Sequence, residues 1–285
     1  MRVYKGENFA DVYEKSLRDL YENPDYSSNP RGLQIKENLN IALEIENPVS
    51  SLYINERRSS QKKYIAAEFI WYFSGRNDVE FISEYASFWK SIQNADGTAN
   101  SAYGNLIFNQ RNKFGINQYE WAINSLSLDL DSRQAIMHFN VPDHQYDGNK
   151  DFVCTMYGIW HIRDNRLNLT IHMRSNDAIL GTPTDVAFFS VLQQQALIHL
   201  KQKYADLKLG KYVHIVDSYH IYEKNFNLVE EMLNHEFRPD YMPSVKKSLI
   251  YMNGSQSSDF ETVRKLKETD SNDEMYRWIT ENLNK

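Results

Sequence analysis

The sequence contains little cysteine, glycine or proline, and it has no excess of positive charge. The single cysteine among 285 residues, Cys154, excludes a disulfide scaffold and a zinc site built from several cysteines, and it fits a reducing compartment. Eleven glycines and seven prolines exclude collagen-like and proline-rich disordered chains. With 32 basic and 38 acidic residues the net charge is −6, so we expect no general binding to nucleic acid or to anionic membranes.

Long apolar runs are also missing. No segment approaches the roughly 18 apolar residues of a membrane span, and residues 1–15 lack the apolar core of a signal peptide. We therefore expect a cytoplasmic protein, located in the host cytoplasm if the chain is viral. The chain does contain 41% hydrophobic residues, with 19 Tyr, 14 Phe and 5 Trp, which suits a large core and a pocket that stacks flat ligands.

Hydrophobic spacing predicts helices and strands in a single α+β domain. Helical spacing covers residues 9–21, 61–74 and 186–204, and alternating or apolar runs predict strands at 39–46, 134–140, 153–163, 167–174 and 212–216. Asp164 and Asn165 tolerate the left-handed conformation of a tight turn, so residues 167–174 should fold back on 153–163. We expect a main catalytic domain over 1–250. Residues 251–285 should form a polar extension with short helical patterns around 260–268 and 273–283.

Cys154 has two interpretations. Free cysteine is among the most buried residue types, so Cys154 is either a structural thiol or a nucleophile. A nucleophilic thiolate needs a neighbouring cation. Pairing across the 164–165 turn places Cys154 opposite residues 174–175, which makes Arg174 the candidate cation.

Arg174 begins the segment Arg-Ser-Asn-Asp-Ala-Ile-Leu-Gly-Thr-Pro-Thr-Asp, which ends at Asp185. The cysteine strand, this segment and the later motif His220-Ile221-Tyr222 resemble the thymidylate synthase family, and within it the deoxycytidylate hydroxymethylases. Four further features follow the family's order over residues 8–230: Arg31, the helix with Glu68, Ser101-Ala102-Tyr103-Gly104, and the turn Asp131-Ser132-Arg133. The resemblance implies a mainly antiparallel or mixed twisted sheet packed by helices, with sheet faces forming a homodimer interface.

The resemblance also implies a reaction. A cysteine thiolate attacks C6 of a pyrimidine nucleotide, and C5 captures a one-carbon unit from 5,10-methylenetetrahydrofolate, with no metal. The implied catalytic residues are Cys154, Glu68, Tyr103 and Asp185. The implied nucleotide-binding residues are Arg31, Arg133, Arg174, Ser175, Asp185, His220 and Tyr222. The implied folate-binding residues are Trp89, Asp177 and Gly181. Arg133 would reach the neighbouring subunit, so that the two subunits share active sites.

Most of these residues have a structural alternative as well. The alternative for Arg31 and Arg133 is a solvated surface charge. Glu68 is alternatively an anchor of a hydrogen-bond network, and Asp177 a turn or helix cap. For Trp89, His220 and Tyr222 the alternative is an aromatic core.

Asp185 is the residue that distinguishes substrates. Thymidylate synthases carry Asn here, whose amide matches N3–H and O4 of uracil. Cytosine reverses this edge, because its N3 accepts and its N4 amino group donates, which suits a carboxyl group. The deoxycytidylate hydroxymethylases carry Asp, so we expect a cytidine monophosphate as substrate. The alternative is that Asp185 caps a helix beginning at Val186.

Three functions follow from these patterns. The first is hydroxymethyl transfer to a cytidine monophosphate, with dCMP favoured and CMP possible. The second is methyl transfer, which gives 5-methyl-dCMP or dTMP. The third is a non-catalytic nucleotide- or RNA-binding relative, against which the full set of motif residues argues.

The sequence departs from the family's usual pattern at three places. Gln134 stands where the family usually has a second phosphate-binding arginine, Val153 and Thr155 replace the usual Pro and His around the cysteine, and no apolar tail ends the chain.

Overall fold

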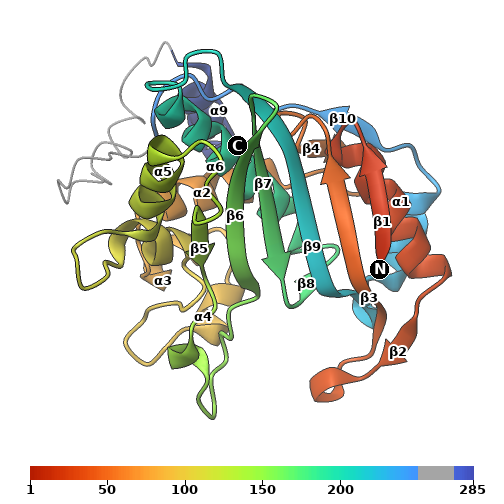
Figure 1. Cartoon of the computed structure of the whole chain (residues 1–285). Coiled ribbons are helices and arrows are strands. Elements are labelled where there is room, and N and C mark those ends of the chain that lie inside the picture. Colours follow the sequence, from red (N-terminus) through yellow and green to blue (C-terminus); the bar gives the residue numbers. More distant parts are fainter. Residues whose placement is uncertain (250–272) are drawn as a thin grey trace.

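A mixed eight-stranded sheet forms the centre of the computed structural model, which describes residues 1–249 and 273–285 (Figure 1). Its strand order is β1-β3-β9-β7-β6-β5, with β2 paired to β3 and β8 to β9. The strands are β1 (Arg2–Gly6), β2 (Tyr26–Ser28), β3 (Ile35–Ile45), β5 (Ile136–His138), β6 (Thr155–Arg163), β7 (Arg166–Met173), β8 (Asn176–Asp177) and β9 (Lys208–Tyr222). A separate antiparallel pair joins β4 (Leu52–Ile54) and β10 (Arg238–Asp240).

Helices cover one face of the sheet. They are α1 (Phe9–Glu22), α2 (Lys62–Phe73), α3 (Val79–Ile82), α4 (Phe88–Ile92), α5 (Gln118–Leu128), α6 (Thr182–Leu200), α7 (Phe226–Leu233) and α9 (Glu274–Leu283). Short 3-10 or π turns lie at Pro30–Gly32, Asn105–Asn109, Pro142–His144 and Glu223–Asn225. Helices α1 and α6 pack on the sheet, α2 packs on α6, and none of the helices in residues 1–249 and 273–285 lies on the face of the central strands that is turned towards the viewer in Figure 1.

The expected α+β class and mixed sheet are confirmed. Strand β3 is antiparallel to β9, and β6 is antiparallel to both β5 and β7, whereas β1·β3 and β7·β9 are parallel. Asp164 and Asn165 adopt positive φ angles of 50° and 57°, as a two-residue hairpin turn requires. This turn fixes the register that brings the ends of β6 and β7 together at the candidate site.

Several predicted boundaries are wrong. Helix α6 begins at Thr182 rather than Val186 and ends at Leu200, because Pro183 lies at its first turn, where a fixed φ favours helix initiation. Strand β9 extends over 15 residues instead of 212–216, and only Ile136–His138 of the predicted strand 134–140 pairs. Cys154 lies directly before β6, not within it.

The end of the chain contributes to the core. Helix α9 packs on α2 and buries Met275, Ile279 and Leu283, and the Trp278 ring lies 6.0 Å from that of Phe69. The predicted helix at 273–283 is therefore confirmed, and this part of the expected polar extension has an apolar face. The helical pattern predicted around 260–268 lies outside the described residues. No helix among residues 1–249 and 273–285 has the length and apolar character needed to cross a bilayer.

Candidate active site

Cys154 and Arg174 lie side by side where β6 begins and β7 ends. The backbone N–H of Arg174 donates to the carbonyl of Cys154 at 2.9 Å, which is the pairing that the hairpin predicts. The guanidinium Nη2 lies 3.6 Å from Sγ of Cys154. The same guanidinium donates to the carbonyl oxygens of Phe152 and Val153, so the cation is held against the thiol by the chain that carries it.

The groups around the Cys154 thiol have opposing effects on its pKa. Burial raises the pKa of the Cys154 thiol above its ordinary value, and the carboxyl groups of Asp185 and Asp151 raise that pKa further. Arg174 and, less strongly, Arg31 lower it. Arg31 is exposed and has a positive φ of 53°, but its charge still acts on the thiol. These two arginines are the cations that favour the reactive thiolate.

Glu68 points from α2 into a hydrogen-bonded aromatic cluster. Its Oε1 accepts from the Tyr64 hydroxyl at 2.7 Å, and the Tyr64 oxygen accepts from Nε1 of Trp89 at 2.9 Å. Burial raises the pKa of Glu68 to about 8, and nearby Asp185 raises it as well. The carboxyl therefore holds a proton near neutral pH and can exchange it, which a general acid–base requires. Trp89 is buried and contacts this cluster through Tyr64.

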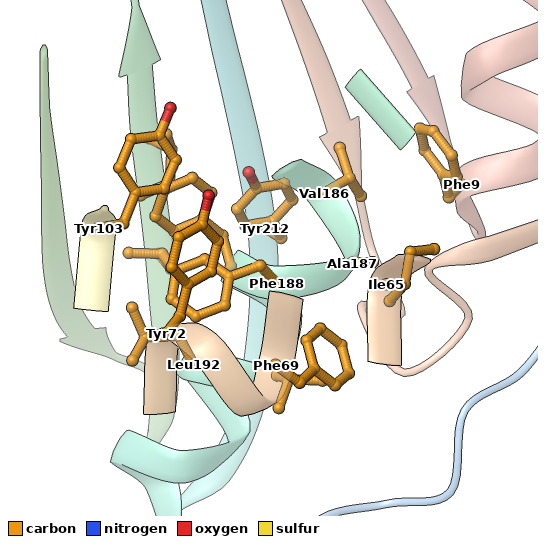
Figure 2. Packing of buried hydrophobic residues seen from close by; sticks show 14 of the residues in the cluster. Phe9, Ile65, Phe69, Tyr72, Tyr103, Val186, Ala187, Phe188, Leu192 and Tyr212 are labelled. Carbon is orange, nitrogen blue, oxygen red and sulfur yellow. The ribbon is translucent and has the colours of Figure 1, made fainter. Parts of the chain in front are cut away.

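Tyr103 is brought to the site by close packing against α2. Its ring stacks on Tyr72 at 5.3 Å and 20°, and the hydroxyl groups of Tyr72, Tyr103 and Tyr212 point away from the apolar cluster around Phe188 (Figure 2). The next residue must be glycine, because a Cβ on Gly104 would lie 1.8 Å from the backbone oxygen of Tyr72. The charges of Asp185 and Cys154 both act on the Tyr103 hydroxyl, which places the three residues around one site.

Asp185 lies inside the first turn of α6 and does not cap that helix. The N-cap position belongs to Gly181, so the capping alternative for Asp185 is wrong. Oδ2 of Asp185 instead accepts from Nδ2 of Asn176 at 2.8 Å. Burial raises the pKa of Asp185 to about 7, so its ionised and neutral forms both occur near neutral pH.

The short strand β8 places Asp177 beside His220. The two residues are partners in the β8·β9 register, and the rings of His220 and Tyr222 meet edge to face at 5.0 Å. Oδ1 of Asp177 accepts from the backbone N–H groups of Ile179 and Leu180. Asp177 thus caps a turn with one oxygen, as its structural alternative proposed. The other oxygen has no hydrogen-bond partner within the described part of the chain.

Arg133 does not reach the thiol of its own chain. It is exposed and lies before β5, whose register pairs Ile136 with Ile159. It therefore lies level with the end of β6, eight residues from Cys154, which corresponds to about 25 Å along a strand. Ser175 follows Arg174 directly and is half-buried.

Three further polar residues belong to the site, and the sequence motifs did not indicate them. Asn176 donates a hydrogen bond to Asp185, and Tyr64 donates one to Glu68. Nε2 of His214 lies 3.0 Å from Oδ1 of Asn176. One sequence feature could have indicated His214: it alternates with Tyr212 and Val216 on the buried face of β9. No group of three or more His, Cys, Asp or Glu side chains suited to a metal ion occurs in residues 1–249 and 273–285.

Comparison with known proteins agrees with this arrangement. The thymidylate synthase family model matches residues 11–268. The chain is 32% identical to the deoxycytidylate 5-hydroxymethyltransferase of Enterobacteria phage T2 over 190 residues, which cover 63% of this chain and 76% of that enzyme. It is 25% identical to the deoxyuridylate hydroxymethyltransferase of Bacillus phage SP01 over 236 residues, 78% of this chain and 59% of the relative.

A solved structure shows the same fold. Thermostable thymidylate synthase A from Bacillus subtilis superposes with a TM-score of 0.66 at 21% identity, covering 84% of this chain and 90% of that one. The family model spans most of the chain and includes the helix with Glu68, the cysteine turn and the segment from Arg174 to Asp185. The chain therefore belongs to the thymidylate synthase family, whose members are folate-dependent transferases that act on C5 of pyrimidine nucleotides.

Proposed function

We propose that this protein transfers a hydroxymethyl group to C5 of a cytidine monophosphate, with dCMP favoured over CMP. The observation that carries the proposal is the Asp185 carboxyl, which is held by Asn176 at 2.8 Å in a site that also contains Cys154. Burial raises the pKa of Asp185 to about 7. The carboxyl can accordingly accept from the cytosine N4 amino group and share a proton with N3.

The Asp185 carboxyl favours cytosine through proton sharing during the reaction as well as through hydrogen bonding. As the thiolate adds to C6, the displaced electron pair raises the electron density on the cytosine N3, and N3 takes up the proton that it shares with the Asp185 carboxyl. Uracil presents N3–H and O4 instead, and an ionised carboxylate has no proton to donate to O4. A site whose buried polar groups are left unpaired by the wrong base discriminates strongly against it.

The reaction begins at Cys154 in this proposal. Its thiolate forms a bond to C6, and the displaced electron pair makes C5 nucleophilic. C5 binds the one-carbon unit and loses its proton, and departure of tetrahydrofolate leaves an exocyclic methylene on C5. The oxygen of a water molecule bonds to the methylene carbon while Glu68 takes the water proton, and the electron pair that returns through C5 expels the Cys154 thiolate and restores the C5–C6 double bond.

Glu68 and Tyr103 assist the proton movements. The pKa of Glu68, raised by burial to about 8, lets its carboxyl donate a proton to the base and take one from water near neutral pH. The hydrogen bond from Tyr64 at 2.7 Å orients that carboxyl. Tyr103, stacked on Tyr72, lies on the C5 side of the pyrimidine.

The remaining residues bind the two substrates. Arg31, Arg174, Ser175 and the partner's copy of Arg133 bind the 5′-phosphate, since an arginine fork matches phosphate oxygens. His220 and Tyr222 hold the ribose 3′-hydroxyl. 5,10-Methylenetetrahydrofolate supplies the one-carbon unit. The free oxygen of Asp177 accepts from its pterin edge, with Trp89 and Gly181 beside it.

Replacement of Asp185 by Asn tests the choice of base. Asp185→Asn should lower kcat/KM for dCMP relative to dUMP by at least about tenfold, because a charge-assisted hydrogen bond in a dry site contributes roughly 1.5–3 kcal/mol. Asp143→Asn, at an exposed position, is the matched control and should leave the ratio unchanged. An unchanged ratio in Asp185→Asn would remove the reason for preferring cytosine.

A further inference from the structure

We infer that Asn176 and His214 are positioning residues that fix the orientation of the Asp185 carboxyl and thereby the pyrimidine edge that the site accepts. The inference rests on the proposed function, in which Asp185 contacts the base. It concerns a buried chain of hydrogen bonds that runs from β9 through β8 to α6, behind the carboxyl.

The chain consists of three consecutive contacts. The Tyr212 hydroxyl lies 2.7 Å from Nδ1 of His214, and Nε2 of His214 lies 3.0 Å from Oδ1 of Asn176. Nδ2 of Asn176 then donates to Oδ2 of Asp185 at 2.8 Å. The Thr182 hydroxyl donates to the same Oδ1 of Asn176 at 2.6 Å, so this oxygen is held from two sides.

The direction of each hydrogen bond follows from the protonation of His214. Burial lowers the pKa of His214 to about 3, so the ring is neutral and only one of its nitrogens carries a proton. Since Oδ1 of Asn176 only accepts, that proton lies on Nε2, and Nδ1 accepts from the Tyr212 hydroxyl. The amide NH2 of Asn176 must then face Asp185. The opposite rotation would set the amide oxygen against a carboxylate.

Packing leaves the Asn176 amide little freedom. A Cβ on Gly181 would lie 2.7 Å from Nδ2 of Asn176, so the absence of a side chain at 181 is what makes room for the amide. Gly181, which the family resemblance assigned to folate binding, thus has a direct structural role beside Asn176. Hydrogen bonds thus join the α6 N-terminus, Asn176 and Asp185 into one unit.

This arrangement decides what Asp185 offers to the base. Oδ2 is occupied by the Asn176 donor, so when the carboxyl is neutral its proton lies on Oδ1, where it can be shared with N3 of cytosine. If the amide were free to reverse, its oxygen would accept the carboxyl proton. Asp185 would then present a bare acceptor, which suits N3–H of uracil. The hydrogen-bond chain therefore favours cytosine over uracil.

The acidity of Asp185 depends on the same donor. The hydrogen bond from Asn176 lowers the pKa of Asp185 and opposes the larger effect of burial. Other titratable groups also face this carboxyl, and any pH dependence must be interpreted with them: Glu68, Tyr64 and Tyr72 of α2, Tyr103, Cys154 and Tyr212 of β9.

The test compares two substitutions of His214 with a matched control. His214→Phe removes the Nε2 donor, whereas His214→Gln retains an N–H donor at a similar distance from the backbone. His199→Phe is the control. His199 is also a buried histidine with two hydrogen-bond partners, Tyr119 and Ser248, but it does not belong to the hydrogen-bond chain that ends at Asp185. The measurements are kcat/KM for dCMP and dUMP, and the pH profile of kcat/KM for dCMP.

His214→Phe should lower the dCMP/dUMP ratio by at least about tenfold and raise the midpoint of the pH profile by about one unit, as expected for loss of one hydrogen bond to a carboxylate. In His214→Gln the dCMP/dUMP ratio and the pH midpoint should both stay close to wild type. His199→Phe should reduce only thermal stability. If His214→Phe yields no folded protein, Thr182→Val removes the second donor to Asn176 and should shift both values in the same direction.

A folded His214→Phe enzyme with the wild-type ratio and midpoint would overturn the inference. An equal change of the ratio and the midpoint in His199→Phe would also overturn it, because it would indicate a general effect of disturbing the core. Where Thr182→Val replaces His214→Phe, a wild-type ratio and midpoint in Thr182→Val would overturn it as well. Failure of the proposed function is distinguishable from these outcomes, because it would appear as a wild-type enzyme with no preference for dCMP.

Discussion

At the scale of single residues, the reactivity of Cys154 depends on a balance between burial and one adjacent cation. Burial raises the pKa of the thiol, and Arg174 opposes this effect from 3.6 Å. The free protein should accordingly hold Cys154 mainly as the thiol at neutral pH. In the proposed reaction, attack by Cys154 requires that Arg174 remain at this position when nucleotide binds.

Alkylation of Cys154 measures this balance directly, because it is the single cysteine in the sequence. The pH midpoint of the iodoacetamide reaction should lie above the value of about 8.5 for a free cysteine. Arg174→Gln should raise the midpoint further, since the loss of a neighbouring cation disfavours the thiolate. Arg174→Lys, which retains the charge, should stay closer to wild type. Equal midpoints in the wild type and Arg174→Gln would show that Arg174 does not stabilise the thiolate.

Glu68 should couple stability to pH. Burial raises its pKa from 4.5 to about 8 in the folded chain, so its contribution to stability is fully present below pH 4.5 and is lost as pH rises through about 8. The wild-type Tm should therefore fall between about pH 5 and pH 8, and Glu68→Gln should show a smaller fall. Asp185, whose pKa is also raised, retains its own effect in both proteins. The same dependence of Tm on pH in the wild type and in Glu68→Gln would contradict the raised pKa of Glu68.

At the scale of elements, close backbone packing determines where Tyr103 lies. Gly104→Ala would set a Cβ 1.8 Å from the Tyr72 oxygen, so the Tyr103 segment must move away from α2. We expect a loss of about 1–3 kcal/mol or more in the free energy of unfolding, together with lower activity. Gly97→Ala is the comparison for backbone strain without a packing clash, because Gly97 has a φ of 79° and nothing within 4 Å, whereas Gly104 has a φ of −60°. Urea unfolding of both variants decides, and a smaller loss in Gly104→Ala than in Gly97→Ala would count against the packing argument.

The elements of this fold were predictable where local chemistry agrees with tertiary packing. The 164–165 turn and the alternation after it predicted the β6–β7 hairpin, and this hairpin alone places Arg174 beside Cys154. The start of α6 was misplaced because Thr182 and Pro183 were interpreted as a loop before the helix. The short strand β5 was overestimated because Phe139, directly after His138, is buried but lies outside the β5·β6 register, although its backbone N–H donates to the carbonyl of Met156.

The polar network behind the site was harder to predict than the fold. Asn176 and His214 are 38 residues apart in sequence, so no helical or strand spacing indicates their contact, although Tyr212, which bonds to His214, lies two residues away in β9. They meet because β8 and β9 pair in one specific register, which a single sequence does not reveal. Motif order identified the residues proposed to touch substrate, whereas the residues that orient them became visible only in three dimensions.

At the scale of the whole molecule, the location of Arg133 favours a shared active site. Arg133 lies about eight strand residues from the Cys154 of its own chain, or roughly 25 Å. The sheet face on which none of the described helices packs carries a hydrogen-bonded group of half-buried residues from three strands, in which His172 contacts Tyr157 at 3.1 Å and Asp217 at 2.8 Å. We propose that this face pairs with a second copy and brings Arg133 to the partner's phosphate site.

Subunit mixing tests the shared site. Cys154→Ser and Arg133→Ala should each be inactive alone, whereas an exchanged mixture should recover up to about a quarter of wild-type activity, because half of the dimers contain one intact site. Light scattering should show a dimer for both variants. Complete absence of recovery after demonstrated exchange would contradict shared sites.

The mass of the product tests hydroxymethyl transfer to a cytidine monophosphate most directly. Wild-type protein is incubated separately with dCMP, CMP and dUMP in the presence of 5,10-methylenetetrahydrofolate, with Cys154→Ser as the inactive control. We predict that dCMP gains one CH2O unit, that tetrahydrofolate is the released folate, and that dUMP reacts far more slowly. A gain of one CH2 unit with release of dihydrofolate, or reaction with dUMP alone, would contradict the account.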